Sequence, residues 1–293
     1  MRIGARGSDL AQVQARMVES RLNDAGIKTE IVVISTHGDR TLDLPLHQLG
    51  FQGVFTKEIE EALLAYQIDL AVHSFKDVAS LQPDGLEIVA VTEREDCADL
   101  LIIRSDKYLD DAEFLPVARN AVVGTSAVRR ATQVKALRPD LEVRDLRGNV
   151  PTRLEKLAKG QYDAIFLASA GVNRLGLSLD AYRVVRLDPS RFVPSPGQGA
   201  LAIEMRSADP LKDQVKTILH HERTAQAARI ERALLKKFGG GCSLPLGAWA
   251  ESNADVWRLH AYWGGGTQVA WTVQDGVDEG DLVELVHKSL SRT

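Results

Sequence analysis

The sequence predicts an α/β protein with two doubly wound blocks and a small α+β block at its end. Short apolar segments rich in β-branched residues alternate with helical segments up to residue 91, and the alternation begins again after a polar stretch at 92–98. Three segments after residue 245 instead have the period and turn spacing of an antiparallel meander. The length of 293 residues fits two or three domains of about 100–200 residues.

The first block is expected to begin with a strand at 2–5 and a helix that Ser8 or Asp9 caps and Gly26 ends. The expected buried face of that helix consists of Leu10, Val13, Met17 and Leu22. A buried strand at 29–35, a helix at 56–66, and strands at 68–74 and 86–91 are expected to follow. Residues 36–53 have no period, which is typical of a lid or a disordered segment.

The second block is expected to hold strands at 100–103, 121–124, 141–144 and 164–168, with helices at 126–137 and 150–159. Residues 187–196 carry three prolines and predict an irregular return linker, which a further strand at 200–205 follows. A helix at 222–238 ends at Gly239. The last block is expected to contain strands at 246–250, 256–263 and 267–273 and a helix from Glu279.

Composition excludes several classes of protein. The net charge of −4 argues against general affinity for nucleic acid, and no stretch reaches the length of a membrane span. The two cysteines, Cys97 and Cys242, lie in unrelated contexts and form neither a disulfide framework nor a metal clip. The adjacent His220 and His221 point in different directions, so no metal pair is expected. A cytoplasmic location follows as the default.

The first candidate site is a cluster of arginines in the second block. Residues 124–153 hold six arginines and one lysine against three acidic residues, a local net charge of +4. Thr125 and Ser126 follow a predicted strand and open a helix, where hydroxyl and backbone N–H groups can bind an anion. Arg129 and Arg130 add forked donors suited to carboxylates or phosphates. A solvated basic face is the alternative for any single arginine.

A second turn in the same block repeats this arrangement. Arg147 follows a predicted strand end, and Arg153 lies in the first turn of the next expected helix. Because two such turns occur in one block, the sequence favours an anion site over a solvated face.

The first block carries polar residues at equivalent places. Lys76 and Asp77 lie just past the carboxyl end of a predicted strand, where open α/β sheets place their ligands. Asp77 can stabilise a developing cation and Lys76 can pair with an anion, although an exposed ion pair between them is an equal alternative. Arg6 and Ser8 follow the first strand in the same way. The turn around Gln198 is either a close-approach turn or a hinge.

Three glycines precede Cys242 in the segment 238–247 and leave its thiol on a bare backbone. A tight loop around a small buried cysteine explains this, and so does room for a large group beside the sulfur. Taken together, the candidates predict a polyanionic ligand held between the two α/β blocks, with a cysteine supplied from the third.

These residues are similar to those of the porphobilinogen deaminase (hydroxymethylbilane synthase) family. The matching segments occur in family order and spacing from the start of the chain to its last third. They are Arg2-Ile3-Gly4-Ala5-Arg6-Gly7-Ser8, Ala71-Val72-His73-Ser74-Phe75-Lys76-Asp77-Val78, Gly124-Thr125-Ser126 with Arg129-Arg130, Leu146-Arg147-Gly148-Asn149-Val150, Gly197-Gln198-Gly199-Ala200 and Gly240-Gly241-Cys242.

The resemblance implies a three-domain fold. Its first two domains resemble periplasmic binding proteins, and the third is a small α+β domain with a three-stranded antiparallel sheet. The implied boundaries are 1–95 with 196–215 for a discontinuous domain 1, 98–190 for domain 2, and 220–293 for domain 3. The strand at 200–205 then returns to the first domain.

The resemblance also implies the chemistry. A dipyrromethane cofactor is attached to Cys242 through a thioether, and four porphobilinogen units are deaminated and added in turn before hydrolysis releases the linear tetrapyrrole, hydroxymethylbilane. Asp77 takes the position of the catalytic aspartate, which stabilises positive charge as ammonia leaves and an azafulvene forms. No metal is implied. The residues in cofactor- and substrate-binding positions are Arg6, Ser8, Gln14, Lys76, Thr125, Ser126, Arg129, Arg130, Arg147, Arg153 and Gln198.

The sequence departs from the family pattern at three places. Ala127 replaces a common second serine, Phe51-Gln52 lacks a usual Gly-Lys, and Ala79 replaces a usual proline. Because the cysteine, the aspartate and the paired arginines are present, we expect an active transferase, and the family leads us to expect a monomer. The alternatives are a non-catalytic two-lobed protein that binds polycarboxylates and a cysteine-dependent sulfur or acyl transferase, for which no histidine base can be assigned.

Overall fold

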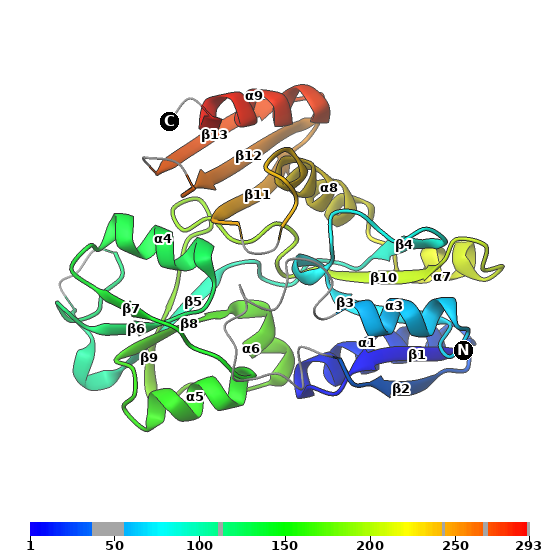
Figure 1. Cartoon of the computed structure of the whole chain (residues 1–293), viewed down its shortest axis with the longest axis horizontal. Coiled ribbons are helices and arrows are strands. Elements are labelled where there is room, and N and C mark those ends of the chain that lie inside the picture. The colour runs from blue at the N-terminus through cyan, green and yellow to red at the C-terminus, as the bar shows by residue number, and fades with distance from the viewer. Residues whose placement is uncertain (37–55, 111–113, 242–243, 266–268, 292–293) are drawn as a thin grey trace. The chain divides into compact units, whose positions relative to one another are not determined.

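The computed structural model describes residues 1–36, 56–110, 114–241, 244–265 and 269–291. The chain divides into two compact units (Figure 1). The first unit contains Met1–Glu95 and Gly197–Cys242, and the second contains Asp96–Pro196 and Ser243–Thr293. Cys242 and most of the predicted lid segment at 36–53 lie outside the described residues. The three-domain boundaries stay a prediction.

The first unit contains a five-stranded mixed sheet. Its strands are β1 (Arg2–Arg6), β2 (Glu30–Ile34), β3 (Leu70–Ser74), β4 (Leu86–Val91) and β10 (Leu201–Arg206), in the order β2-β1-β3-β10-β4. β1 runs parallel to β2 and β3, whereas β10 runs antiparallel to β3 and β4. The expected return of this late strand to the first sheet is confirmed.

Helices cover both faces of this sheet. α1 (Asp9–Asp24) and α7 (Lys212–Leu219) share one apolar cluster with the sheet, and α3 (Lys57–Leu64) packs in a second cluster. α8 (Glu222–Lys237) contributes to a third cluster around Phe75. Together these helices cover both faces of the mixed sheet and exclude water from its parallel strands, which are usually buried on both faces.

Two expectations about burial in this unit are wrong. The buried residues of α1 are Ala11, Gln14, Ala15, Val18 and Leu22, whereas Met17 is 45% exposed. The helix turns its small residues to the sheet, so that its backbone approaches closely and the bulkier Met17 faces outward. β2 is an edge strand rather than a buried one, and its Val33 is 55% exposed.

The second unit contains a sheet with the same pattern of strand directions. Its strands are β5 (Asp99–Arg104), β6 (Val122–Gly124), β7 (Glu142–Arg144), β8 (Ala164–Ala168) and β9 (Tyr182–Arg186), in the order β7-β6-β8-β5-β9. β6 is parallel to β7 and β8, and β5 is antiparallel to β8 and β9. The two doubly wound sheets predicted from the sequence are therefore present.

The helices of the second unit lie on both faces of its sheet. α4 (Val128–Leu137) packs in one apolar cluster through Val134, and α5 (Val150–Ala158) and α6 (Ser169–Leu175) pack in the other. The sequence did not predict β9, α6 or α7. β9 (YRVVR) lies at an edge and shows no strict alternation of apolar and polar residues, and the two helices have fewer than nine residues each, so none gives a strong periodic signal.

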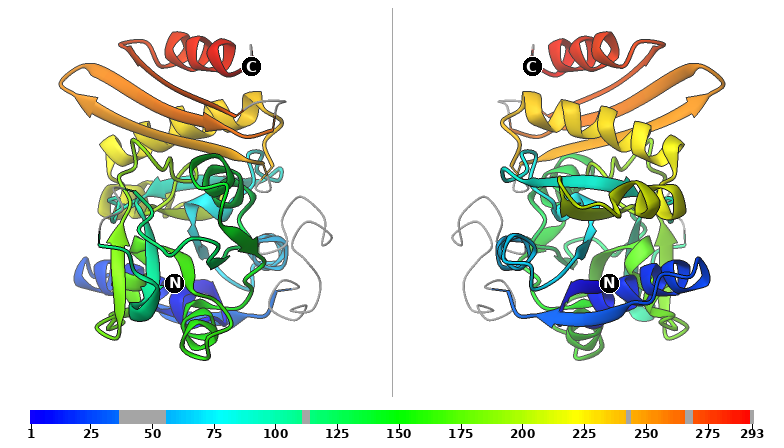
Figure 2. Two further views of the ribbon diagram at one scale, coloured as in Figure 1. Left: turned by 90° about the vertical axis from the view of Figure 1, so that its left-hand side faces the viewer. Right: turned by 90° about the vertical axis from the view of Figure 1, so that its right-hand side faces the viewer.

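The end of the chain forms the predicted antiparallel meander. β11 (Leu246–Asn253), β12 (Val256–Trp263) and β13 (Ala270–Gly276) pair in sequence order. α9 (Glu279–Ser291) lies along one face of this sheet, as both views of Figure 2 show.

The strand directions determine which segments share an edge. In the first sheet Leu201, the first residue of β10, pairs with Ser74, the last residue of β3. In the second sheet Asp99, the first residue of β5, pairs with Ala168, the last residue of β8. The start of each antiparallel strand therefore lies at the carboxyl edge of the parallel strands, where such sheets bind ligands.

Candidate functional site

In the first unit, β3 continues directly into a short 3₁₀ helix, η2 (Phe75–Asp77). Phe75 is buried and anchors this turn, whereas Asp77 is exposed. Lys76 Nζ donates to Gln198 Oε1 at 3.3 Å, because the segment before β10 lies beside the end of β3. The structure therefore brings Lys76 and Gln198 together next to an accessible carboxylate.

Gln14 and Ser8 support the same edge from α1. Gln14 is 3% exposed, and its amide exchanges hydrogen bonds with Ser74 Oγ at 3.0 and 3.2 Å. Ser8 is the N-cap of α1, as predicted, and its hydroxyl accepts from Ala11 N at 3.4 Å. Arg6 ends β1 at this edge. Arg6 and Ser8 thus lie at the carboxyl end of β1, and Gln14 contacts the last residue of β3.

A buried ion pair fixes the segments that leave and re-enter the first unit. Arg94 forms two hydrogen bonds to Glu231 of α8, at 2.6 and 3.2 Å, and Glu231 is fully buried. Glu231 also accepts from Gly197 N at 2.7 Å, and Arg94 Nε donates to Gln198 O at 2.8 Å. One carboxylate of α8 therefore holds both segments, a contact that was not predicted from the sequence.

In the second unit, the turn after β6 carries the predicted hydroxyl groups. Thr125 is 2% exposed, and its Oγ1 accepts from Ala127 N at 3.2 Å. Ser126 Oγ donates to Leu146 O at 2.8 Å and accepts from Leu146 N at 3.1 Å. Ser126 therefore joins the turn after β6 to the turn after β7. Ala127 is the N-cap of α4 and provides no side-chain cap, so the first N–H groups of that helix lack the acceptor that a serine would supply.

Arg129 and Arg130 are buried rather than displayed on a surface. Each is 5% exposed, and both guanidinium groups pair with the fully buried carboxylate of Asp99, at 2.8 and 2.6 Å. They also donate to the backbone carbonyls of Val193 and Phe166. Burial lowers the pKa of Arg129 below its ordinary value, while the charge of Asp99 opposes this shift. The sequence analysis did not include Asp99.

Arg147 has a different environment from this pair. It is half-buried, and its Nη1 atom is shielded from solvent and has no hydrogen-bond partner among the residues that the structure describes. Arg153 lies one turn into α5, and its Nε donates to Gly148 O at 2.8 Å. A buried guanidinium N–H without an acceptor is costly, so this position favours an anionic ligand.

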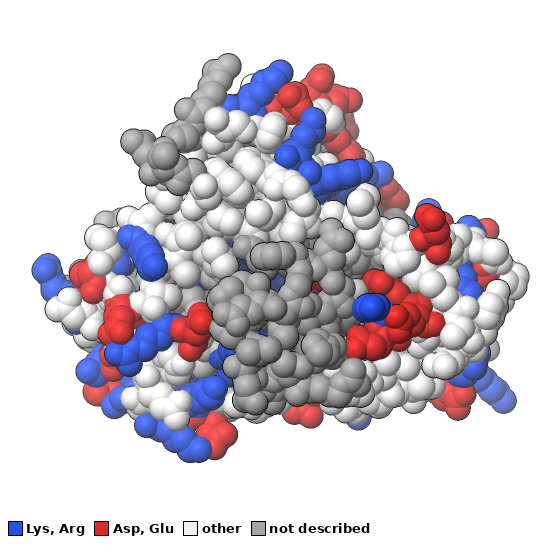
Figure 3. Space-filling model, in the orientation of Figure 1, with Lys and Arg blue, Asp and Glu red and all other residues white. Residues whose placement is uncertain are grey.

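The local charge of +4 does not produce a basic face. Arg129, Arg130, Arg138 and Arg144 are ion-paired, since Arg138 pairs with Asp140 and Arg144 with Glu142 in addition to the pair at Asp99. Figure 3 shows acidic and basic side chains interspersed over the part of the second unit that faces the viewer. Specific turns, rather than a continuous basic surface, are therefore the candidates for anion binding.

In the glycine loop (residues 238–247), the backbone conformation explains two of the glycines. Gly239 and Gly240 adopt φ values of +96° and +76°, in the left-handed region that glycine favours. Gly240 is also buried beside Ser80, so a side chain there would lie 3.0 Å from the Ser80 hydroxyl. The predicted attachment residue, Cys242, lies outside the described residues.

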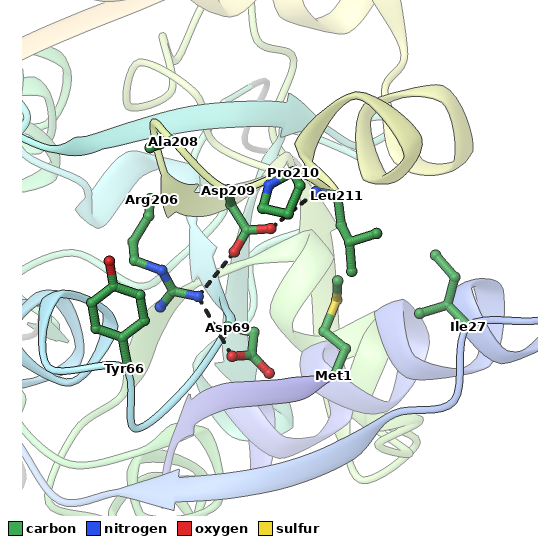
Figure 4. Close-up of a pocket in the computed structure, with 9 residues that line it drawn as sticks. All are labelled: Met1, Ile27, Tyr66, Asp69, Arg206, Ala208, Asp209, Pro210 and Leu211. Carbon is green, nitrogen blue, oxygen red and sulfur yellow. Dashed lines mark hydrogen bonds and ion pairs between the residues drawn. The ribbon is translucent and has the colours of Figure 1, made fainter.

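A cavity of about 460 Å³ lies at the opposite edge of the first sheet (Figure 4). Arg206 bridges Asp209 and Asp69 at 2.9 and 3.5 Å, and its guanidinium lies 4.4 Å from the centre of the Tyr66 ring. Arg206 ends β10 and Asp69 precedes β3, so the cavity is far in topology from Asp77. Its charged side chains are one arginine and two aspartates, so it is not suited to a polyanion.

The remaining expectations concern metals and membranes. No group of three or more metal-binding side chains occurs among the described residues. Within the same residues, no helix is both long and apolar enough to cross a bilayer. His220 and His221 have separate structural contacts: His220 Nδ1 accepts from Val91 N, and His221 caps α8.

Comparison with known proteins gives two family matches. Residues 1–214 match the model "Porphobilinogen deaminase, dipyromethane cofactor binding domain", and residues 225–262 match "Porphobilinogen deaminase, C-terminal domain". The porphobilinogen deaminase of Syntrophobacter fumaroxidans is 45% identical over 254 residues, which are 85% of this chain and 79% of that protein. The porphobilinogen deaminase of Trichlorobacter lovleyi is 46% identical over 261 residues, 88% and 81% of the two chains.

Among solved structures, a periplasmic substrate-binding protein of an ABC transporter from Coxiella burnetii is similar to this chain. The similarity covers 78% of this chain and 95% of that one, with 14% sequence identity and a TM-score of 0.45.

Proposed function

The chain belongs to the porphobilinogen deaminase family and contains its dipyrromethane cofactor-binding domain, and on this premise we propose that it is a transferase of the hydroxymethylbilane synthase type. It joins four porphobilinogen units head to tail on the cofactor and releases the linear tetrapyrrole. The observation that carries this proposal is the exposed carboxylate of Asp77, beside the Lys76–Gln198 contact at the ligand-binding edge of the first sheet.

The side chains present fit a cofactor with several carboxylates. The buried Nη1 of Arg147, which has no partner among the described residues, and the start of α4, which has no side-chain cap, are both suited to an anionic acceptor. We propose that the cofactor is attached to Cys242. The residues that would bind its carboxylates or those of the growing chain are Arg6, Ser8, Gln14, Lys76, Thr125, Ser126, Arg129, Arg130, Arg147, Arg153 and Gln198.

The arginine pair has a reduced role in this proposal. Arg129, Arg130 and Asp99 together carry a net charge of +1, whereas the two arginines alone would carry +2. The electrostatic attraction of this triad for an anion is therefore weaker than the two arginines alone suggest. Arg147, whose Nη1 lacks a partner, is therefore the stronger donor to a carboxylate in the second unit.

In this proposal Asp77 is the catalytic residue. When bound, the cofactor supplies the free α-carbon to which the first porphobilinogen becomes joined. As the C–N bond of the substrate's aminomethyl group breaks and ammonia leaves, positive charge develops on the substrate pyrrole, and the Asp77 carboxylate stabilises it. Asp77 can then accept the proton released when the new C–C bond has formed. Lys76, which Gln198 orients, binds a substrate carboxylate.

The non-catalytic alternative is not favoured, because the relatives that match most of the chain are named porphobilinogen deaminase. A monomer that acts in the cytoplasm is part of the proposal. Sedimentation of the purified protein tests the first part, and fractionation of cells tests the second.

Intact mass spectrometry tests the function directly. The bare chain has a mass of 32.1 kDa, and protein purified under reducing conditions is expected to carry two additional pyrrole units. Added porphobilinogen should raise the mass in steps of one pyrrole. Cys242→Ala should abolish the added mass, and Asp77→Asn should keep it but lower kcat by about 10²–10⁴-fold, the usual contribution of general acid–base catalysis. A bare mass that stays unchanged after incubation with porphobilinogen would refute the proposal.

A further inference from the structure

The turn that carries Asp77 is held by an arginine from outside the candidate site. Arg232 lies on α8, and its Nη1 donates to the carbonyls of Phe75 and Val78 at 3.3 and 3.0 Å. Its Nη2 donates to the carbonyl of Ala79 at 2.5 Å. One guanidinium therefore binds three carbonyls on both sides of Asp77.

The same guanidinium is also packed against the buried side of the turn. Its Cζ lies 4.6 Å from the centre of the Phe75 ring, within the range of a cation–π contact. Phe75 is 6% exposed and belongs to the apolar cluster to which α8 contributes Ala228. Arg232 thus fixes the backbone and the anchoring side chain of η2 at once. A lysine, with one ammonium group, cannot reproduce this forked geometry.

A second contact connects this turn to the glycine loop. Ser80 lies three residues after Asp77, and its hydroxyl donates to Gly240 O at 2.9 Å. Gly240 follows the end of α8, the helix that carries Arg232, and lies two residues before Cys242. The turn therefore contacts both α8 and the start of the glycine loop that follows α8, all within the first unit.

We propose that Arg232 and Ser80 are positioning residues that keep the Asp77 carboxylate in register with, that is, at a fixed position relative to, the backbone that leads to Cys242. Arg232 fixes the turn to α8, and Ser80 fixes the same turn to the loop that follows α8. This inference rests on the proposed function, because it assigns meaning to the distance between the catalytic aspartate and the cofactor attachment point. Neither residue touches substrate in this account.

The register matters because the reacting groups tolerate little displacement. A shift of about 1 Å at a catalytic group can lower a rate by about 10²-fold. Loss of one anchor should therefore lower kcat, while the carboxylate-binding residues that determine KM keep their places. A role limited to folding would instead change the stability and leave the kcat of correctly folded holoenzyme unchanged.

The test compares Arg232→Lys and Ser80→Ala with matched controls, all as holoenzyme. Arg229→Lys changes an exposed arginine of the same helix, and Ser105→Ala removes an exposed serine whose hydroxyl also donates to a backbone carbonyl, that of Ala181. Intact mass gives the fraction with cofactor, and kcat is expressed per holoenzyme. Arg232→Lys is expected to lower kcat about tenfold or more and Ser80→Ala about threefold, with KM within about threefold of wild type and both controls within about twofold.

The double variant separates a shared role from two independent ones. If both residues act on one register, the loss of kcat in the double variant should be smaller than the product of the single losses. Multiplicative losses, or single variants with unchanged kcat per holoenzyme, would overturn the inference. Because Ser80→Ala removes only one hydroxyl, its kcat still tests the inference if Arg232→Lys folds poorly.

Asp77→Asn measured in the same series separates this inference from the proposed function. Wild-type protein that gains porphobilinogen units and loses activity on Asp77→Asn supports the function whatever the two positioning variants do. If Asp77→Asn retains full activity, the function assigned to Asp77 is wrong, and with it the reason for the register.

Discussion

The two five-stranded sheets place different groups at the same point of their topology. In the first sheet, Gln198 precedes the antiparallel strand β10 and accepts a hydrogen bond from Lys76. In the second sheet, Asp99 begins the antiparallel strand β5 and pairs with Arg129 and Arg130. The amide orients a cation without adding charge, whereas the carboxylate neutralises half of the charge it contacts.

This difference separates two uses of a positive side chain at a strand end. The second sheet buries its arginine pair against a carboxylate, and removal of that carboxylate would leave both positive charges buried and uncompensated. At the first sheet, Lys76 is half-buried and its neighbour Asp77 is exposed, so neither is enclosed as the arginine pair is. A count of arginines in the sequence therefore does not show which of them lie at the surface.

Among the variants that test this comparison, Asp99→Asn is expected to have the largest effect on stability. It leaves two buried guanidinium groups without a counter-ion, which should reduce the free energy of unfolding by about 3–5 kcal/mol. Urea unfolding measures the change. Asp106→Asn is the control, because its pair with Arg104 is exposed and should contribute less than about 1 kcal/mol. Equal losses in the two variants would show that Asp99 does not differ from a surface carboxylate.

Arg147→Ala tests the other kind of arginine. If its unpartnered Nη1 binds a substrate or cofactor carboxylate, its loss should raise KM or reduce cofactor loading by about 10–100-fold, the value of one or two hydrogen bonds to a charged group. The free energy of unfolding of the cofactor-free protein should not fall, because the change removes a buried N–H that has no acceptor among the described residues. Arg144→Ala, which removes an exposed arginine paired with Glu142, should leave KM within about twofold. A stability loss without a change in KM or loading would place Arg147 with the structural pair.

Gly240→Ala examines the backbone of the first unit. At a φ of +76° an alanine costs about 1–2 kcal/mol, and its Cβ would meet the Ser80 hydroxyl at 3.0 Å. The free energy of unfolding should fall by about that amount. Gly7→Ala is the control, because Gly7 has no positive φ and its added Cβ meets Val33 at an ordinary 3.6 Å. A loss no greater than that of Gly7→Ala would show that the glycine run serves only to make room for an attached group.

The sequence predicted the sheets better than it predicted the contacts across them. Strands such as β4 and β8 were located to the residue, because buried apolar runs bounded by turns are a local signal. Asp99 was missed because its contact with Arg129 depends on the antiparallel insertion of β5, thirty residues earlier in the chain. Arg232 was missed because it lies in an ordinary charged helix, more than 150 residues from the turn it holds. Long-range pairing of polar groups leaves no periodic trace in a sequence.

The smallest expected effect on stability is that of Asp140→Asn, which removes an exposed carboxylate paired with an arginine of the second unit. The hydrogen bonds from Arg138 lower the pKa of Asp140 from 3.8 to about 2. Since the folded pKa lies below the unfolded one, the pair stabilises the fold above about pH 5, and this contribution disappears as the pH falls from about 4 to 2. Solvent screening of this exposed pair keeps the contribution below about 1 kcal/mol. The unfolding free energies of wild type and Asp140→Asn should therefore differ slightly at pH 6, approach each other below about pH 4 and converge near pH 2, with Asp255→Asn, in the exposed turn between β11 and β12, as the control. A difference that instead grew on acidification would mean that burial, and not the guanidinium, controls this carboxylate.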